Sequence, residues 1–419
     1  MKSHQAAARP SPALRLGIRA NLAQFALLVG VNGLVGALVG QERTLVPLLG
    51  ERVFQVRSTT AVLLFIVTFG AAKAGANLAA GFFADRLGRK RVLVAGWLVG
   101  IPVPIMLMAA PNWSWVLVAN VLLGINQGLT WSTTVIMKID LAGPRRRGLA
   151  MGLNEFSGYL AVALSAAASG LLASHFGLRP EPLFLGLAVA GLGLGLSVLV
   201  VKETLEHVRL EAAGQDGKGF AEVAALAGYR DRALSAASRT GLVNNANDAL
   251  AWGLLPLVMA TEGLNTSQIG IVAGLYPAVW GIGQLVTGAL SDRIGRRLPV
   301  ALGMWLQAVA LALFSVTHGF AARAGASVLL GLGTALTYPS LLAAVGDLAA
   351  PSWRAAAVGV YRTWRDGGYV VGAVGAGGLT DAFGSSVALT AVAAVTALSG
   401  VDAWANLFPS SSERLNKVG

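Results

Sequence analysis

The sequence predicts an all-α membrane protein whose twelve transmembrane helices form two pseudo-symmetric six-helix bundles. Three observations lead to this prediction: an apolar composition, twelve apolar stretches long enough to cross a bilayer, and two motifs that each occur twice at one spacing. Of the 419 residues, 55% are hydrophobic and 12% are charged, whereas soluble domains carry about 25% charged residues. The 53 glycines suit close packing between membrane helices.

A helix of about 20 apolar residues spans the hydrocarbon core, and twelve stretches meet this length. In the first half they are 20–41, 58–82, 92–110, 113–138, 148–173 and 181–201. In the second half they are 233–258, 267–290, 299–317, 320–345, 355–380 and 385–407. The resulting domains are an N-terminal tail (1–19), a first bundle (20–201), a polar linker (202–232), a second bundle (233–407) and a C-terminal tail (408–419).

A short polar turn follows the second apolar stretch of each half. Residues 81–91 read G-F-F-A-D-R-L-G-R-K-R, and residues 288–298, 207 positions later, read G-A-L-S-D-R-I-G-R-R-L. Glycine permits the backbone angles of a tight reversal, and an aspartate at a helix end can pair with nearby arginines. Such repetition indicates internal duplication. The shared positions are Gly81 and Gly288, Asp85 and Asp292, Arg86 and Arg293, Gly88 and Gly295, and Arg89 and Arg296.

A second repeat has the same offset of 207 residues, because residues 140–152 and 347–359 agree at seven of thirteen positions. It pairs Asp140 with Asp347, Pro144 with Pro351, and Arg147 with Arg354. Two independent motifs at one spacing support a duplication of the whole six-helix unit.

The repeated turn resembles the loop signature of the major facilitator superfamily, and the resemblance covers nearly the whole chain. It implies a secondary transporter in which two bundles rock around a central cavity, opening it to either side in turn. It also implies that the charged and glycine residues of both repeats act in the conformational switch. One position departs from the family pattern: Asn120 stands where many proton-driven members carry an arginine one turn before a glycine, here Gly124.

Basic residues are distributed unevenly over the predicted topology. Of the 32 lysines and arginines, 22 fall in segments predicted to be cytoplasmic and five in external ones, namely Arg43, Arg52, Arg57, Arg179 and Arg323. This asymmetry follows the positive-inside rule and removes the need for a nucleic-acid partner to explain a net charge of +12. We expect a multi-pass protein of the bacterial-type cytoplasmic (inner) membrane with both termini in the cytoplasm and no cleaved signal peptide.

Ionisable residues inside apolar spans are functional candidates, because a charge at the bilayer centre costs roughly 2.5–3.5 kcal/mol. Lys73 lies mid-span, with Asn77 one turn away on the same helix face. Arg362, Arg365 and Asp366 share a face of the eleventh span, and two guanidinium groups there suit an anionic solute. The alternatives are a structural ion pair for Lys73 and cytoplasmic gate pairs for the arginines.

Three carboxylates are candidates for proton coupling: Glu155, Asp248 and Asp366. Glu155 occupies the repeat position of Arg362, so the two could approach across the cavity, and burial raises the pKa of a carboxylate toward neutrality. A structural bridge from Glu155 to Arg362 or Arg365 is an equal alternative. Glu42 and Arg43 are expected at the external membrane interface.

Further polar and aromatic side chains at mid-span are candidate solute contacts, although amides also join helices and aromatics also pack. They are Asn32, Asn126, Gln127, Trp131, Asn244, Trp252 and Tyr338.

The chain has no cysteine, no nucleotide-binding loop and no catalytic motif, and its four histidines fall in tails or loops. We therefore expect no metal, no cofactor and no enzyme activity. The predicted function is proton-coupled transport of a small organic solute, anionic or polar, by a monomer in the lipid bilayer. The alternatives are efflux of amphiphilic drugs by proton antiport and, in another class, a membrane sensor that binds solute without moving it.

Overall fold

The computed structural model describes residues 17–142, 147–204, 220–349 and 353–407. Within these ranges the chain forms helices and no strand, as the all-α prediction requires. The predicted N-terminal and C-terminal tails, most of the linker, and Pro144 and Pro351 lie outside the described residues.

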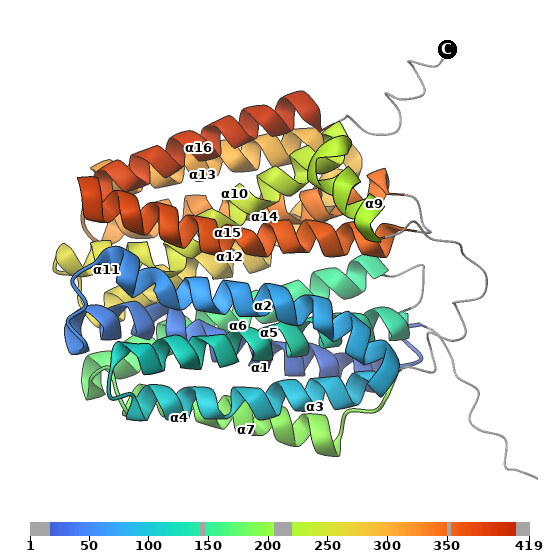
Figure 1. Ribbon diagram of the computed structural model, residues 1–419, viewed down its shortest axis with the longest axis horizontal. Coiled ribbons are helices and arrows are strands. Elements are labelled where there is room, and N and C mark those ends of the chain that lie inside the picture. Colours follow the sequence, from blue (N-terminus) through green and yellow to red (C-terminus); the bar gives the residue numbers. More distant parts are fainter. Residues whose placement is uncertain (1–16, 143–146, 205–219, 350–352, 408–419) are drawn as a thin grey trace, which may run out of the picture.

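The helices of the first half lie together in one layer and those of the second half in another (Figure 1). In the first layer, α1 (Leu22–Leu48) continues directly into η1 (Leu49–Val53). The other elements of this layer are α2 (Thr59–Leu87), α3 (Arg89–Gly100), α4 (Pro102–Ala109), α5 (Trp113–Ala142), α6 (Arg147–Phe176), η3 (Glu181–Leu183) and α7 (Phe184–Leu199). The linker ends in α9 (Phe220–Ala225) and η4 (Leu226–Arg230). The second layer contains α10 (Arg232–Trp252), α11 (Leu254–Thr261), α12 (Thr266–Ile294), α13 (Arg297–Val316), α14 (Phe320–Leu348), α15 (Arg354–Phe383) and α16 (Ser385–Asn406).

Nine helices of the described chain are long and apolar enough to cross a membrane. The other three predicted spans correspond to α5, to α10 with α11, and to α15, which hold most of the polar candidates. Almost every residue of α10 is buried, so protein rather than lipid surrounds its polar side chains. A membrane helix that is enclosed by other helices can carry more polar residues than a helix that faces lipid.

The packing of the two halves repeats helix by helix. In the first half α1 packs on α6, α2 on α5, and α3 on both α5 and α7. The second half has the equivalent pairs α10 with α15, α12 with α14, and α13 with α14 and α16. Two symmetric contacts, α2 with α15 and α6 with α12, join the halves. We call the helix ends next to Lys202 and Arg232 the linker side, and the other ends the distal side.

The repeated turn is built as predicted. Gly88 and Gly295, with φ of 96° and 85°, end α2 and α12 in the left-handed region that favours glycine. Arg89 then donates from Nε to Asp140 Oδ2 at 3.2 Å, and Arg296 repeats this contact with Asp347 at 3.0 Å. Each arginine therefore joins the linker-side ends of two helices in its own bundle.

The rest of the repeat is described in part. Arg296 also pairs with Asp292 at 2.6 Å, while Arg86 and Arg293 lie at exposed positions. Gly81 lies within α2, but its surroundings and the side chains of Asp85, Arg147 and Arg354 are outside what the structure describes, so the switching role of these residues stays a prediction.

Glycine allows close helix crossing within the first bundle. A Cβ atom on Gly36 of α1 would lie 2.1 Å from the carbonyl oxygen of Gly158 on α6, whereas one on Gly30 of the same helix would meet nothing within 4 Å.

We predict that Gly36→Ala lowers the melting temperature of the purified protein while Gly30→Ala leaves it unchanged or raises it slightly. Overpacking costs about 1–3 kcal/mol, and alanine is the better helix former at an open position. Thermal melting in one detergent compares the two variants. Equal melting temperatures would contradict the proposed crossing of α1 and α6.

Candidate functional site

Lys73 and Asp366 meet where α2 of the first bundle packs on α15 of the second. Lys73 Nζ lies 4.0 Å from Asp366 Oδ1, and the side chains are 14% and 4% exposed. Asn77, one turn along α2, donates to Asp366 Oδ2 at 2.6 Å, while Arg365 Nη1 lies 3.3 Å from Oδ1. One buried carboxylate therefore receives two cations and an amide from both halves of the chain.

Aromatic rings surround this junction. The Arg365 guanidinium lies 4.4 Å from the ring centroid of Tyr338 and donates to the Tyr159 hydroxyl at 3.4 Å. Tyr159 of α6 packs on Trp280 of α12 with centroids 3.6 Å apart, and Trp280 contacts Tyr338 edge to face. Lys73 Nζ lies 5.6 Å and 5.5 Å from the rings of Phe69 and Tyr369, within cation–π range. The junction can thus hold a negative charge beside apolar ring faces.

Glu155 lies near this junction but is satisfied within its own bundle. Its Oε1 accepts from Trp131 Nε1 and from Asn154 Nδ2, each at 3.1 Å. Asn32 Nδ2 in turn donates to the Asn154 carbonyl oxygen at 2.7 Å. Among the described contacts, no hydrogen bond or ion pair joins Glu155 to Arg362 or Arg365, so the bridge that the repeat suggested is absent there.

A second buried ion pair joins the bundles on the distal side of the first. Arg43 of α1 donates to both oxygens of Asp248 on α10, at 2.8 Å and 3.1 Å, and Tyr369 donates to Asp248 Oδ2 at 2.5 Å. The guanidinium also lies 5.2 Å from the Trp252 ring. Glu42 and Arg43 are both buried within the protein, and α1 continues for several residues beyond them. Their expected level at the external membrane interface stays a prediction.

Other candidates lie inside single bundles. Asn126 donates to the Gly96 carbonyl oxygen and Gln127 to that of Val35, while Asn244 accepts from Gln307 of α13. These amides join helices of one half and are not brought to the junction. Arg362 is half-buried on α15, one turn before Asp366.

Two residues of the junction, Tyr159 and Trp280, were not among the candidates predicted from the sequence. The repeat offset points to both, since Trp280 occupies the position equivalent to Lys73 and Tyr159 the position equivalent to Asp366. The junction thus uses the same two positions of each half, with charges in one copy and rings in the other. No group of histidine and acidic residues suited to a metal ion occurs in the described parts of the chain.

The distal ends of α2 and α15 are held together by Asp381. Its carboxylate accepts from the Ser58 hydroxyl at 2.6 Å and from the backbone N–H groups of Thr59 and Thr60 at 2.6 Å and 3.0 Å. Burial alone would raise the pKa of Asp381, but these hydrogen bonds outweigh it and hold the pKa well below its usual value. At the other contact between the halves, Gly170 and Gly270 bring α6 and α12 into backbone contact.

Two repeated bundles of membrane helices that meet around buried charges define a multi-pass membrane protein of the transporter class. The family profile described as Major Facilitator Superfamily matches residues 22–239 and 240–418, and the chain belongs to this superfamily. The structure resembles that of the nucleoside transporter NupG, with a TM-score of 0.72 and 14% identity over 92% of this chain and 98% of the other. A mutant form of NupG gives a TM-score of 0.74 at the same identity.

Curated relatives include the multidrug resistance protein MdtG of Escherichia fergusonii, 29% identical over 221 residues, which are 51% of this chain and 52% of MdtG. The Salmonella arizonae protein of that name is 28% identical over the same length. The chain therefore matches about half the length of these relatives.

We predict that Arg43→Gln and Asp248→Asn each lower the melting temperature more than Tyr369→Phe does. Removing one partner of a buried ion pair leaves an uncompensated charge and costs about 3–5 kcal/mol, whereas losing one hydrogen bond to a charged group costs about 1.5–3 kcal/mol. The double variant Arg43→Gln/Asp248→Asn should lose less melting temperature than the sum of the two single decreases. Additive losses would show that the two side chains do not interact.

The Asp381 contact should be insensitive to pH across the neutral range. A carboxylate with a lowered pKa contributes stability that is present above its unfolded value, about 3.9, and lost only as the pH falls through the lower folded value. We therefore expect the labelling rate of Leu63→Cys, a buried position one turn inside this contact, to be constant from pH 5 to 8. Each rate is normalised to that of Ser386→Cys, an exposed position.

Asp381→Asn should accelerate this labelling severalfold at pH 7, since a neutral amide accepts the N–H groups less strongly. Asp402→Asn, which changes a half-buried carboxylate near the end of α16, is the matched control. A wild-type rate that rises severalfold between pH 8 and pH 5 would contradict the account.

Proposed function

We propose that the chain is a proton-coupled secondary transporter that moves a small organic anion with an apolar portion, by alternating access between its two bundles. The observation that carries the proposal is the junction of Lys73, Arg365 and Asp366, where cations from both bundles share one carboxylate within a ring of aromatic side chains. In this proposal the linker side is cytoplasmic, as the distribution of basic residues indicates.

The charges at the junction favour an anion. Lys73, Arg362 and Arg365 bring three positive charges, while Asp366 and Glu155 bring two negative charges. The 4.0 Å separation of Lys73 and Asp366 exceeds hydrogen-bond distance, so the ammonium keeps donors for another partner. A carboxylate or phosphate group suits the planar fork of Arg365, and the faces of Tyr159, Trp280 and Tyr338 suit an apolar or aromatic portion.

The same geometry suggests how protons couple to the solute. When Asp366 is ionised it competes with a solute anion for Lys73 and Arg365. When it is protonated, both cations are available and the site gains a positive charge. Proton and anion should therefore bind cooperatively, which corresponds to symport. Glu155 and Asp248 are secondary candidates for carrying the proton.

The distribution of contacts supports a state closed on the distal side. Among the described residues, the hydrogen bonds between α2 and α15 run from Asn77 with Asp366, at mid-helix, to Ser58 with Asp381, at the distal ends. Arg43 with Asp248 lies on the same side of the junction. Opening this side requires these contacts to separate, so the cycle exchanges them for contacts at the linker side.

A second candidate function is efflux of amphiphilic drugs by proton antiport. The resemblance to proteins named MdtG favours it, and so does the number of aromatic rings at the junction. The two candidates differ in the charge of the solute and in the direction of the proton gradient that drives its movement.

The test begins with a thermal-shift screen of purified protein against organic anions and lipophilic cations, followed by flux measurements in vesicles with an imposed pH gradient. We expect stabilisation by anions and uptake driven by inward protons. Stabilisation by cations alone, with efflux against inward protons, would favour the second candidate and overturn the first.

We predict that Lys73→Ala weakens binding of any anion found in this screen by roughly tenfold or more, because hydrogen bonds to charged groups contribute about 1.5–3 kcal/mol. Lys73→Arg should retain part of the affinity. The control is Arg239→Ala, which removes a half-exposed cation of α10 paired with Asp402. Unchanged affinity in a folded Lys73→Ala protein would exclude Lys73 from the site.

A further inference from the structure

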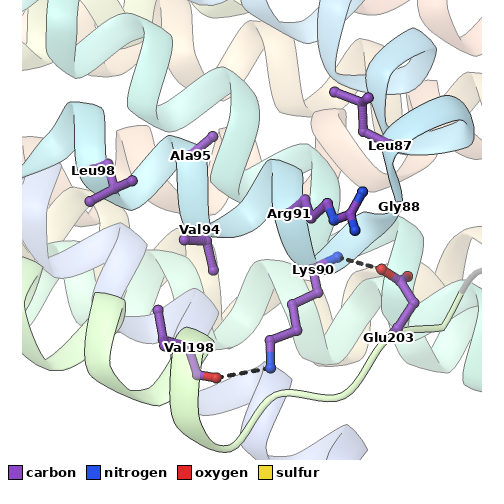
Figure 2. Close-up of a pocket in the computed structure, with 9 residues that line it drawn as sticks. All are labelled: Leu87, Gly88, Lys90, Arg91, Val94, Ala95, Leu98, Val198 and Glu203. Carbon is purple, nitrogen blue, oxygen red and sulfur yellow. Dashed lines mark hydrogen bonds between the residues drawn. The ribbon is translucent and has the colours of Figure 1, made fainter.

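Two grooves open on the first bundle at its linker side, and Arg91 lines both of them. The first groove, about 690 Å³, lies between α3 and the end of α7 and is lined by Val94, Leu98 and Val198 (Figure 2). The second, about 640 Å³, lies between α2, α3 and α5 and is lined by small side chains of α2 such as Ala71 and Ala79. The grooves therefore flank the first turns of α3 and share one arginine.

The second groove is on the outer face of α2, away from the junction between the bundles. Ala71, Gly75 and Ala79 recur at four-residue steps and share one face of the helix. Lys73 and Asn77, on a different face, contact Asp366 of the other bundle. Exposed apolar side chains border both grooves, among them Phe83, Leu87 and Leu98. In a membrane protein, surfaces of this kind face lipid.

The basic residues at the mouth of the first groove are available to an anion. Arg91 is exposed. Lys90 Nζ donates to the Val198 carbonyl oxygen at 2.9 Å, which leaves two of its three donors. The neighbouring Glu203 carboxylate is engaged by the backbone N–H groups of Arg89, Lys90 and Thr204, so the first turn of α3 offsets its charge (Figure 2).

We propose that an anionic phospholipid of the linker-side leaflet binds here, with its phosphate on Arg91 and Lys90 and one acyl chain in each groove. Basic pockets between transmembrane helices bind anionic headgroups. Along α2 the second groove extends from Leu87 to Ala71, about 24 Å at 1.5 Å per residue. That length accommodates a chain that crosses half of a hydrocarbon core of about 30 Å.

The second bundle lacks this arrangement, although its fold is the same. Leu298 occupies the position equivalent to Arg91, and Arg297, equivalent to Lys90, lies 4.1 Å from the ring centroid of Trp404. The proposed site therefore occurs once in the described chain, and the lipid would contact only the first bundle.

Native mass spectrometry of the full chain can test the proposal by measuring retained phosphatidylglycerol and phosphatidylethanolamine. Arg91→Ala should reduce phosphatidylglycerol binding roughly fivefold, the effect of one basic residue near an anionic surface, and leave phosphatidylethanolamine unchanged. Arg230→Ala, which removes another exposed linker-side arginine, should change neither. An equal loss of phosphatidylglycerol in Arg91→Ala and Arg230→Ala would show that the lipid is held by general charge attraction, and would overturn the proposed site.

A second variant tests the acyl-chain groove separately from the headgroup. A Cβ atom on Gly75 would meet nothing within 4 Å, so Gly75→Leu should fold and fill the second groove. We expect it to weaken phosphatidylglycerol binding severalfold while Arg91 remains in place. Full retention of the lipid by Gly75→Leu, or its displacement by millimolar inorganic phosphate, would show that the groove holds no acyl chain and would overturn the proposal.

Discussion

The carboxylate of Asp366 is buried between the two bundles, and the cations and the amide that compensate its charge come from both of them. Its own helix supplies Arg365, while Lys73 and Asn77 come from the opposite bundle. Since an uncompensated charge inside a membrane costs several kcal/mol, separating α2 from α15 at this level requires another partner for each charge. In the proposed function a solute anion and a proton are such partners, so the same contact would both hold the bundles together and respond to their binding.

Arg43 and Asp248 add a second contact of the same kind nearer the distal side. Buried ion pairs contribute little net stability because desolvation offsets their attraction. They are specific, however, because the planar fork of Arg43 contacts both oxygens of Asp248 and such a bidentate contact requires a defined geometry. Together with Asp381 and the close approach of Gly170 to Gly270, this pair defines one arrangement of the two bundles. A cycle between two such arrangements needs contacts that are specific and of modest net strength.

Much of the fold followed from the sequence because its signals are periodic and repeated. Apolar length predicted most of the helices, and the offset of 207 residues predicted the repeated turns that end at Gly88 and Gly295. The ion pairs of Arg89 with Asp140 and of Arg296 with Asp347 were not predicted, although the repeat had already matched these positions. The burial of Arg43 could not be predicted from the sequence, because its partner Asp248 lies 205 residues away in the chain. Asn126, Gln127 and Asn244 could not be assigned from sequence, since an amide that satisfies a neighbouring carbonyl group looks the same as one that faces a solute.

Distances between spin labels on the two bundles, compared in wild-type protein and in Asp366→Asn, test most directly whether this carboxylate couples the bundles. Phe176 and Phe383, both exposed at the distal ends of α6 and α15, are suitable positions for a pair, and Leu87 with Ile294 provides one at the linker side. Neutralising Asp366 should shift the distal pair to longer distances and the linker-side pair to shorter ones. Unchanged distance distributions at both sides would contradict the claim that this carboxylate couples the bundles.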